Sequence, residues 1–265
     1  MSRNLLCAAV VFLLLGSALP CFSQSFGGTT LSGTEPFYGK PPYHYENSEY
    51  YFISFRTDPA VIRALVPEPL VPLSAGDIQI FFTRQKVTDP VRLSYDEVYL
   101  MIPVSFENAF GGYIPVLYLD RAEAIIPGRA IWGFNKTGAD IRFEKSDRHV
   151  DVTVAQMDTV IIRASFTLGE PMAHPQQSGI GSIINLKYVP SVIRDAPPEV
   201  LQLTYAKLTG NRSGQMRPGR ATLEFSGSRL NPLDQIPVLE IKSAGFTENS
   251  YTLEYGEVLF DYLDP

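Results

Sequence analysis

The stretch IWGFNKTGAD at residues 131–140 places the chain's only tryptophan, a phenylalanine and a lysine at alternate positions. In an extended segment Trp132, Phe134 and Lys136 would share one face, because side chains alternate along a strand. Aromatic neighbours would take the lysine amine out of water and favour its neutral form. In the alternative interpretation Lys136 ends the strand and reaches water, while the two aromatic residues belong to an ordinary core.

The N-terminal sequence carries one arginine, an apolar run from Leu5 to Leu15 and then small residues. This pattern is typical of a secretory signal peptide and is too short for a membrane span. We expect a leader at residues 1–23 and a secreted or periplasmic protein. The Gly, Ser and Thr rich residues 24–45 predict a flexible arm, and residues 46–265 are long enough to form one domain.

Composition limits the classes of function. Cys7 and Cys21 both lie in the leader, so the mature chain has no thiol and its stability must come from its core. The net charge of -6 becomes -7 once Arg3, the only charged residue of the leader, is removed. An acidic chain without a basic run argues against nucleic acid and anionic membranes and favours a small-molecule partner.

The elements that position the candidate residues are mostly strands. The segment from Asp58 to Pro67 predicts a short helix, with Asp58 as its cap, Pro59 at its first position and Pro67 as its end. Residues 149–169 alternate apolar and polar side chains about a turn near Asp158, which is typical of a hairpin. Further short strands are predicted at Ile78–Phe82, Tyr99–Phe106, Ile183–Val189, Ala221–Phe225, Val238–Ser243 and Glu257–Tyr262. Such a series predicts a barrel or a sandwich.

Motifs for other chemistry are missing from the sequence. There is no Gly-rich phosphate loop after a strand and no G-x-S-x-G. His44, His149 and His174 lack the paired spacing of metal ligands. We therefore expect neither a metal nor a cofactor.

Four fragments in order resemble the acetoacetate decarboxylase family: Ile102–Phe106 (IPVSF), Tyr118–Asp120 (YLD), Gly128-Arg129, and Phe134-Asn135-Lys136. The segments FRTDPAVIRALVPEPL, NPLDQIPVLEIKSAGF and GEVLFDYL extend the resemblance over nearly the whole mature chain. It implies a mainly β, α+β fold with few short helices, built around an antiparallel β-barrel. It also implies a homo-oligomer.

The resemblance implies that the neutral amine of Lys136 attacks a substrate ketone to form an iminium, which accepts electrons when a carbon–carbon bond breaks. The family is itself a standard example of a lysine activated by desolvation or by a neighbouring cation. Glu97 falls where the family has an active-site glutamate that handles protons or repels a second anion. Asp96 is the alternative if the register differs by one residue, and an exposed acid at a strand start is the alternative to any catalytic role.

Three positions depart from the family pattern: Thr137 replaces a second lysine, Ser48 an arginine and Phe82 an acidic residue. Only burial, or Arg129 if it folds nearby, is then left to favour the neutral amine. Arg56 matches a family arginine, which on a strand could also serve structure alone. We expect Trp132, Phe134, Phe82, Arg129 and Arg56 to bind substrate, in a pocket lined by the segments 132–136 and 95–106.

These considerations predict a carboxy-lyase that decarboxylates a β-keto acid such as acetoacetate. Two alternatives remain open at this point. One is an aldolase-dehydratase acting on pyruvate and aldehydes through the same lysine. The other is a barrel that binds a small carbonyl or apolar ligand without turnover, which the reduced charge at Ser48, Phe82 and Thr137 favours.

Overall fold

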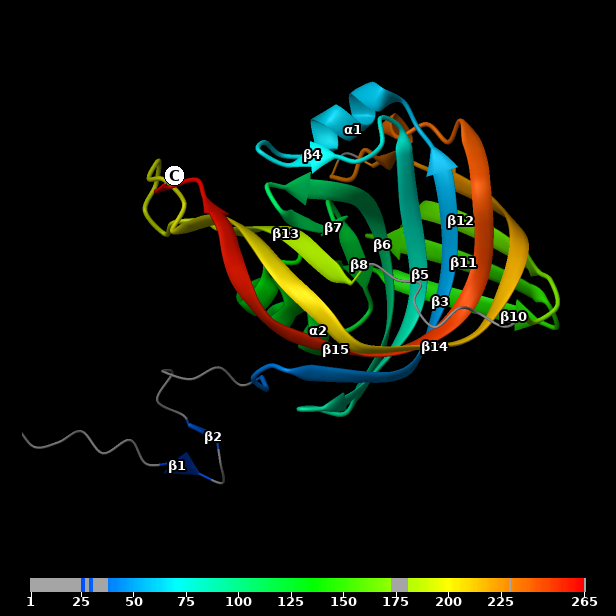
Figure 1. Ribbon diagram of the computed structural model, residues 1–265, viewed down its shortest axis with the longest axis horizontal. Helices are drawn as coiled ribbons and strands as arrows, with labels where there is room; N and C mark the ends of the chain where they lie inside the picture. The colour runs from blue at the N-terminus through cyan, green and yellow to red at the C-terminus, as the bar shows by residue number, and fades with distance from the viewer. Residues whose placement is uncertain (1–24, 27–28, 31–37, 173–180, 229, 265) are drawn as a thin grey trace, which may run out of the picture. The chain divides into compact units, whose positions relative to one another are not determined.

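The computed structural model describes residues 25–26, 29–30, 38–172, 181–228 and 230–264 (Figure 1). The chain divides into two compact units, Met1–Phe37 and Tyr38–Pro265. In the first unit β1 (Ser25–Phe26) pairs antiparallel with β2 (Thr29–Thr30). The predicted leader, residues 1–23, lies outside the described residues.

The second unit consists mainly of strands, with few and short helices, as predicted. Its helices are α1 (Pro59–Leu65), α2 (Ala122–Pro127), the π-helix η1 (Gly128–Trp132) and the 3-10 helix η2 (Leu233–Gln235). Its strands are β3 (Tyr43–Arg56), β4 (Val71–Pro72), β5 (Asp77–Asp89), β6 (Leu93–Phe106), β7 (Ala109–Tyr113), β8 (Leu117–Leu119), β9 (Lys136–Gly138), β10 (Asp140–Ser146), β11 (His149–Gln156), β12 (Thr159–Leu168), β13 (Ser182–Val189), β14 (Val200–Phe225) and β15 (Glu240–Asp261). Among the helices of the described residues, none is long and apolar enough to cross a membrane.

These strands form one sheet with the order β10-β11-β12-β14-β13-β7-β6-β5-β3-β15, and β15 pairs in turn with β14. The two longest strands, β14 and β15, run side by side over most of their length (Figure 1). Most pairs are antiparallel, but β7 with β13 and β8 with β9 are parallel. The prediction of a purely antiparallel barrel is therefore corrected to a single mixed sheet.

Local sequence signals explain the ends of several elements. The Asp58 side chain accepts a hydrogen bond from the backbone N–H of Ala60 at 2.7 Å, and the helix ends before Pro67, as predicted. The predicted hairpin is confirmed as β11 and β12, and its turn residues Met157 and Asp158 have positive φ. Strand β3 starts at Tyr43, so the folded unit begins inside the segment predicted as a flexible arm.

Alternation along the strands separates two apolar clusters. On β6, Val98, Leu100 and Ile102 belong to the larger cluster, whereas Tyr95 and Met101 belong to the second. The sheet face that carries the second cluster also carries the candidate site.

Candidate active site: a buried lysine and glutamate in an aromatic cavity

The second cluster surrounds a cavity of about 710 Å³. Strands β3, β5, β6 and β15 each contribute alternate side chains to its wall, together with residues of α2, η1, β13 and β14. Six tyrosines lie among them, and we call them the cavity tyrosines: Tyr43, Tyr45, Tyr50, Tyr95, Tyr99 and Tyr251. The cavity is large enough for a small-molecule ligand.

Lys136 points into this cavity from the first position of β9. Its side chain is 6% exposed, and Nζ donates a hydrogen bond to Oε2 of Glu97 at 3.1 Å. The strand register brings the pair together, because Leu117 on β8 pairs with Lys136 and Leu119 on β8 pairs with Glu97. Each group offsets part of the desolvation cost of the other, so the pair is stable only while both members are present.

Aromatic rings enclose the lysine amine, as the sequence predicted. Nζ lies 5.2 Å from the ring centroid of Phe134 and 5.3 Å from that of Tyr95. Trp132 and Phe134 are both buried, both line the cavity and meet edge to face at 6.3 Å. The expected aromatic surroundings of the amine are therefore present.

The prediction of a strand over residues 132–136 is wrong. Trp132 ends the π-helix η1, Gly133 adopts a left-handed conformation with φ of 75°, and only Lys136 belongs to a strand. Tertiary contacts stabilise this course, because the Trp132 carbonyl accepts hydrogen bonds from Thr204 Oγ1 at 2.6 Å and Asn185 Nδ2 at 3.2 Å. The rings reach the lysine from a helix and a turn instead of from one strand face.

Gly128 and Arg129 hold the lysine in different ways. A Cβ atom on Gly128 would lie 2.6 Å from Cδ and 2.7 Å from Cε of Lys136, so only glycine leaves room for the side chain. Arg129 Nη1 donates to the Lys136 carbonyl at 2.9 Å, and the residue is exposed and outside the cavity lining. The prediction that Arg129 binds substrate is thus corrected, because its guanidinium binds the backbone.

The structure decides between the two acidic residues of β6. Glu97 faces the cavity, whereas Asp96 lies on the opposite face of the strand and forms an ion pair with Arg84 at 3.0 Å. Burial raises the pKa of the Asp96 carboxyl, and Arg84 partly opposes that increase. Glu97 is therefore the carboxylate available to the site.

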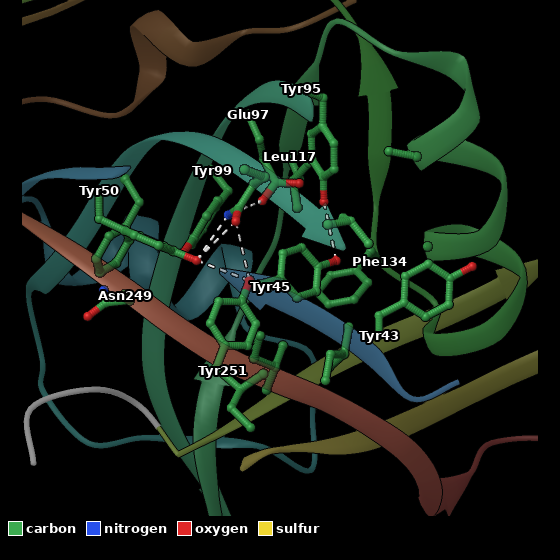
Figure 2. A pocket seen from close by; sticks show the side chains of 18 of the residues that line it. Tyr43, Tyr45, Tyr50, Tyr95, Glu97, Tyr99, Leu117, Phe134, Asn249 and Tyr251 are labelled. Carbon is green, nitrogen blue, oxygen red and sulfur yellow. Dashed lines mark hydrogen bonds between the residues drawn. The ribbon is translucent and has the colours of Figure 1, made fainter. Parts of the chain in front are cut away.

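Sequence reasoning missed a hydrogen-bonded group next to Glu97 (Figure 2). Gln85 Nε2 donates to the Tyr50 hydroxyl at 3.0 Å and lies 3.5 Å from Oε1 of Glu97. The Tyr251 hydroxyl lies 3.0 Å from that of Tyr50. The signal in the sequence was the alternation of side chains along each strand. It places Gln85 on the same face of the sheet as Glu97 of the next strand.

Burial raises the pKa of every cavity tyrosine, so all six remain neutral at physiological pH. A second pair of hydroxyls, those of Tyr45 and Tyr95, lies 3.3 Å apart. Four of the six hydroxyls thus bind one another in two pairs, and the tyrosine rings form much of the cavity wall.

Two further residues predicted to bind substrate lie elsewhere. Phe82 is fully buried in the larger apolar cluster, on the face of β5 opposite to the cavity. Arg56 forms an ion pair with Glu240 at 3.2 Å, and both side chains are about half exposed. Both predictions are therefore corrected, because neither residue lines the cavity.

The other two departures from the family pattern also lie outside the cavity lining. The Thr137 hydroxyl accepts a hydrogen bond from Gln156 at 3.2 Å, and the Ser48 hydroxyl accepts one from the backbone N–H of Lys86 at 3.0 Å. In the part of the chain that the structure describes, no three histidine, cysteine or acidic side chains lie close enough to hold a metal ion.

Together, the fold and the site define a class of β-rich protein with a buried amine, paired with a carboxylate, at an aromatic cavity that is large enough for a small molecule. The family model for acetoacetate decarboxylase matches residues 29–263. The acetoacetate decarboxylase of Paraburkholderia phytofirmans is 34% identical over 238 residues, which cover 87% of this chain and 91% of that relative. The one from Chromobacterium violaceum is 32% identical, with 87% and 93% covered. The chain belongs to the acetoacetate decarboxylase family.

Solved structures agree with this assignment. The crystal structure of acetoacetate decarboxylase from Legionella pneumophila matches with a TM-score of 0.76 and 25% identity, covering 88% of this chain and 94% of that one. The enduracididine biosynthesis enzyme MppR, solved in complex with pyruvate, matches with a TM-score of 0.75 at 19% identity, covering 88% and 95%. The second match shows a shared fold alone.

Proposed function

We propose that this protein is a Schiff-base-forming lyase that decarboxylates a β-keto acid, such as acetoacetate, through an iminium on Lys136. The observation that carries the proposal is the buried contact of 3.1 Å between Lys136 Nζ and Glu97 Oε2 at the wall of an aromatic cavity. The family and the relatives named acetoacetate decarboxylase support the same reaction class.

The amine must be neutral to attack a carbonyl carbon. Glu97 is the group placed to accept the proton of Lys136, because its carboxylate oxygen already accepts the hydrogen bond from Nζ.

In the proposed reaction Nζ attacks the keto carbon, water leaves and an iminium forms. The bond between the α-carbon and the carboxylate breaks, carbon dioxide leaves and the electron pair moves into the iminium to give an enamine. Glu97 returns a proton to the enamine carbon. Water then hydrolyses the new iminium, which releases the methyl ketone and regenerates the amine.

Borohydride trapping tests the proposal. The protein is incubated with acetoacetate, reduced and digested, and the modified lysine is located by peptide mass spectrometry. We expect an adduct on Lys136 that disappears in Lys136→Ala, together with the release of carbon dioxide. Lys187 is the internal control, because burial lowers the pKa of its amine although it lies outside the cavity. An adduct on Lys187 in place of Lys136, or none at all, contradicts the proposal.

The aldolase-dehydratase reaction is the second candidate, and the same trapping with pyruvate tests it. The protein whose fold is shared, MppR, has been solved with pyruvate and with a condensation product of pyruvate and an aldehyde. Trapping of pyruvate, followed by condensation with an added aldehyde, would replace decarboxylation as the assigned reaction. Ligand binding that Lys136→Ala leaves unchanged, without turnover, would instead indicate a binding protein.

We also propose that the chain is exported through its predicted leader and acts as a homo-oligomer. The apolar run from Leu5 to Leu15 supports export, and the family resemblance supports oligomerisation. N-terminal sequencing of the mature protein should place the cleavage near Ser23. Light scattering should give a multiple of the protomer mass.

A further inference from the structure

The cavity is large for a substrate of the size of acetoacetate. A water molecule occupies about 30 Å³ in the liquid, so a compound of about seven heavy atoms occupies roughly 200 Å³ at most. The cavity measures about 710 Å³. Most of its space would remain unfilled around acetoacetate.

A connected group of polar side chains surrounds Lys136 in this cavity. Lys136, Glu97 and Gln85 lie together, and Tyr50 and Tyr251 join them through hydrogen bonds. The hydroxyls of Tyr45 and Tyr95 bind each other, and that of Tyr43 donates to the backbone carbonyl of Gly39 at 2.9 Å. Five of the six tyrosine hydroxyls therefore have partners within the protein.

The remaining surface includes apolar side chains of the second cluster. Six of them, none with a charge or a hydroxyl, we call the apolar wall: Met101, Ile114, Trp132, Ile183, Leu208 and Leu253. The single polar hydrogen of Trp132, on Nε1, is already donated to the Glu254 carbonyl at 2.8 Å. The six side chains of this wall offer a ligand hydrocarbon and ring surface.

Positively charged side chains are few in the cavity lining. Among the described residues that line it, the lysine and arginine side chains are those of Lys136 and Arg212, and Arg212 is exposed. A buried second anion would find no cation besides the amine that performs the chemistry. The buried part of the cavity is thus suited to an uncharged, apolar group.

We propose that the ligand of this cavity carries an extended apolar group, an alkyl chain or an aryl ring, that lies along the apolar wall while its carbonyl reaches Lys136. For the reaction this means a β-keto acid of the form R–CO–CH₂–COO⁻ in which R is larger than methyl. The reaction balances as before, with R–CO–CH₃ and carbon dioxide as products and one proton taken up. The identity of the substrate rests on the proposed function, whereas the apolar character of the ligand does not.

Binding can be measured without the amine chemistry. Secondary alcohols from 2-propanol to 2-heptanol cannot form an iminium, and Trp132, the chain's only tryptophan, reports their binding by fluorescence. We expect the dissociation constant to fall about fourfold for each added methylene. A dissociation constant that does not fall with chain length overturns the proposal.

Turnover separates this proposal from the proposed function. The measurement compares the release of carbon dioxide from acetoacetate, 3-oxohexanoate and benzoylacetate, with the rate in Lys136→Ala subtracted as background. We expect kcat/KM for 3-oxohexanoate to exceed that for acetoacetate about 15-fold, because it adds two methylene groups. Equal or faster turnover of acetoacetate overturns this inference and leaves the lyase intact. Tight alcohol binding without turnover or trapping of any keto acid refutes the lyase and supports an apolar binding cavity.

A matched pair of variants tests where the apolar group lies. Leu208→Phe adds a ring to the apolar wall, so affinity should stop increasing with the chain length of the alcohol at a shorter alcohol than in the wild type. Leu186→Phe adds the same ring to a half-buried leucine of β13 that packs on the larger cluster and lies outside the cavity. In that control the gain should end at the same alcohol as in the wild type. If both variants match the wild type, the group does not lie along the apolar wall, and the proposal fails.

Discussion

Replacing Gly128 by alanine would place a methyl group against the side chain of Lys136. The added Cβ would lie 2.6 Å from Cδ, whereas ordinary van der Waals contacts begin at 3.4 Å, so the lysine side chain must move by about 0.8 Å. A displacement of about 1 Å at a reacting group can cost roughly 100-fold in rate. We expect the rate of iminium trapping and of carbon dioxide release to fall by that order.

Stability should respond in a different way. Gly128 has φ of -59° and ψ of -45°, a helical conformation in which alanine is favoured over glycine by about 1 kcal/mol. The free energy of unfolding should therefore change by less than about 1 kcal/mol in chemical denaturation. A loss of rate without a loss of stability would show that the methyl group acts on the lysine.

Gly138→Ala is the matched control. It lies at the end of the same strand as Lys136, and its added Cβ would meet only Ile125 Cδ1, at an ordinary distance of 3.8 Å. This variant should keep the wild-type rate. A wild-type rate of iminium trapping in Gly128→Ala, or an equal loss of that rate in both variants, would refute the role assigned to Gly128.

Three further predictions follow from burial and charge. Lys136→Met should lower the free energy of unfolding by about 3–5 kcal/mol because it leaves the Glu97 carboxylate buried without a counter-charge, and adding Glu97→Gln should restore most of the loss in urea denaturation. The cavity tyrosines should stay neutral above pH 10 in the folded protein. The free energy of unfolding should therefore keep its full value below pH 10 and fall at higher pH, where the tyrosines of the unfolded chain ionise. A full phenolate absorbance of the native protein near pH 10 would contradict this. Arg56→Ala should change stability by less than about 1 kcal/mol and leave turnover unchanged, since its ion pair is half exposed; a large rise in KM would return Arg56 to the substrate site.

The sequence predicted most strands, because their apolar period of two is a local property. It divided the two longest strands into shorter runs, since both contain register shifts where the period breaks. The predicted run Ala221–Phe225 is only the end of β14, and the runs starting at Val238 and at Glu257 overlap the two ends of β15. The pairing of β7 with β13 joins segments distant in sequence, so no local pattern could have identified its parallel direction.

The course of the chain before Lys136 was predicted wrongly for a similar reason. The alternation of Trp132, Phe134 and Lys136 is typical of a strand, yet the first of these residues ends a π-helix. The hydrogen bonds that hold this helix end come from Asn185 and Thr204, on strands far along the chain. Apolar pattern alone predicted which side chains are buried, and tertiary contacts determined how they are brought together.

Departures from a family pattern bear on the reaction only if they change the cavity. Thr137 binds Gln156 on the side of β9 away from the amine, Ser48 binds a strand backbone, and Phe82 packs in the other apolar cluster. None of these three residues is among those that line the cavity. The groups that contact the amine directly, Glu97, Tyr95 and Phe134, are all present. The three departures therefore do not argue against iminium formation, and under the proposal made above the size and the apolar wall of the cavity select the substrate.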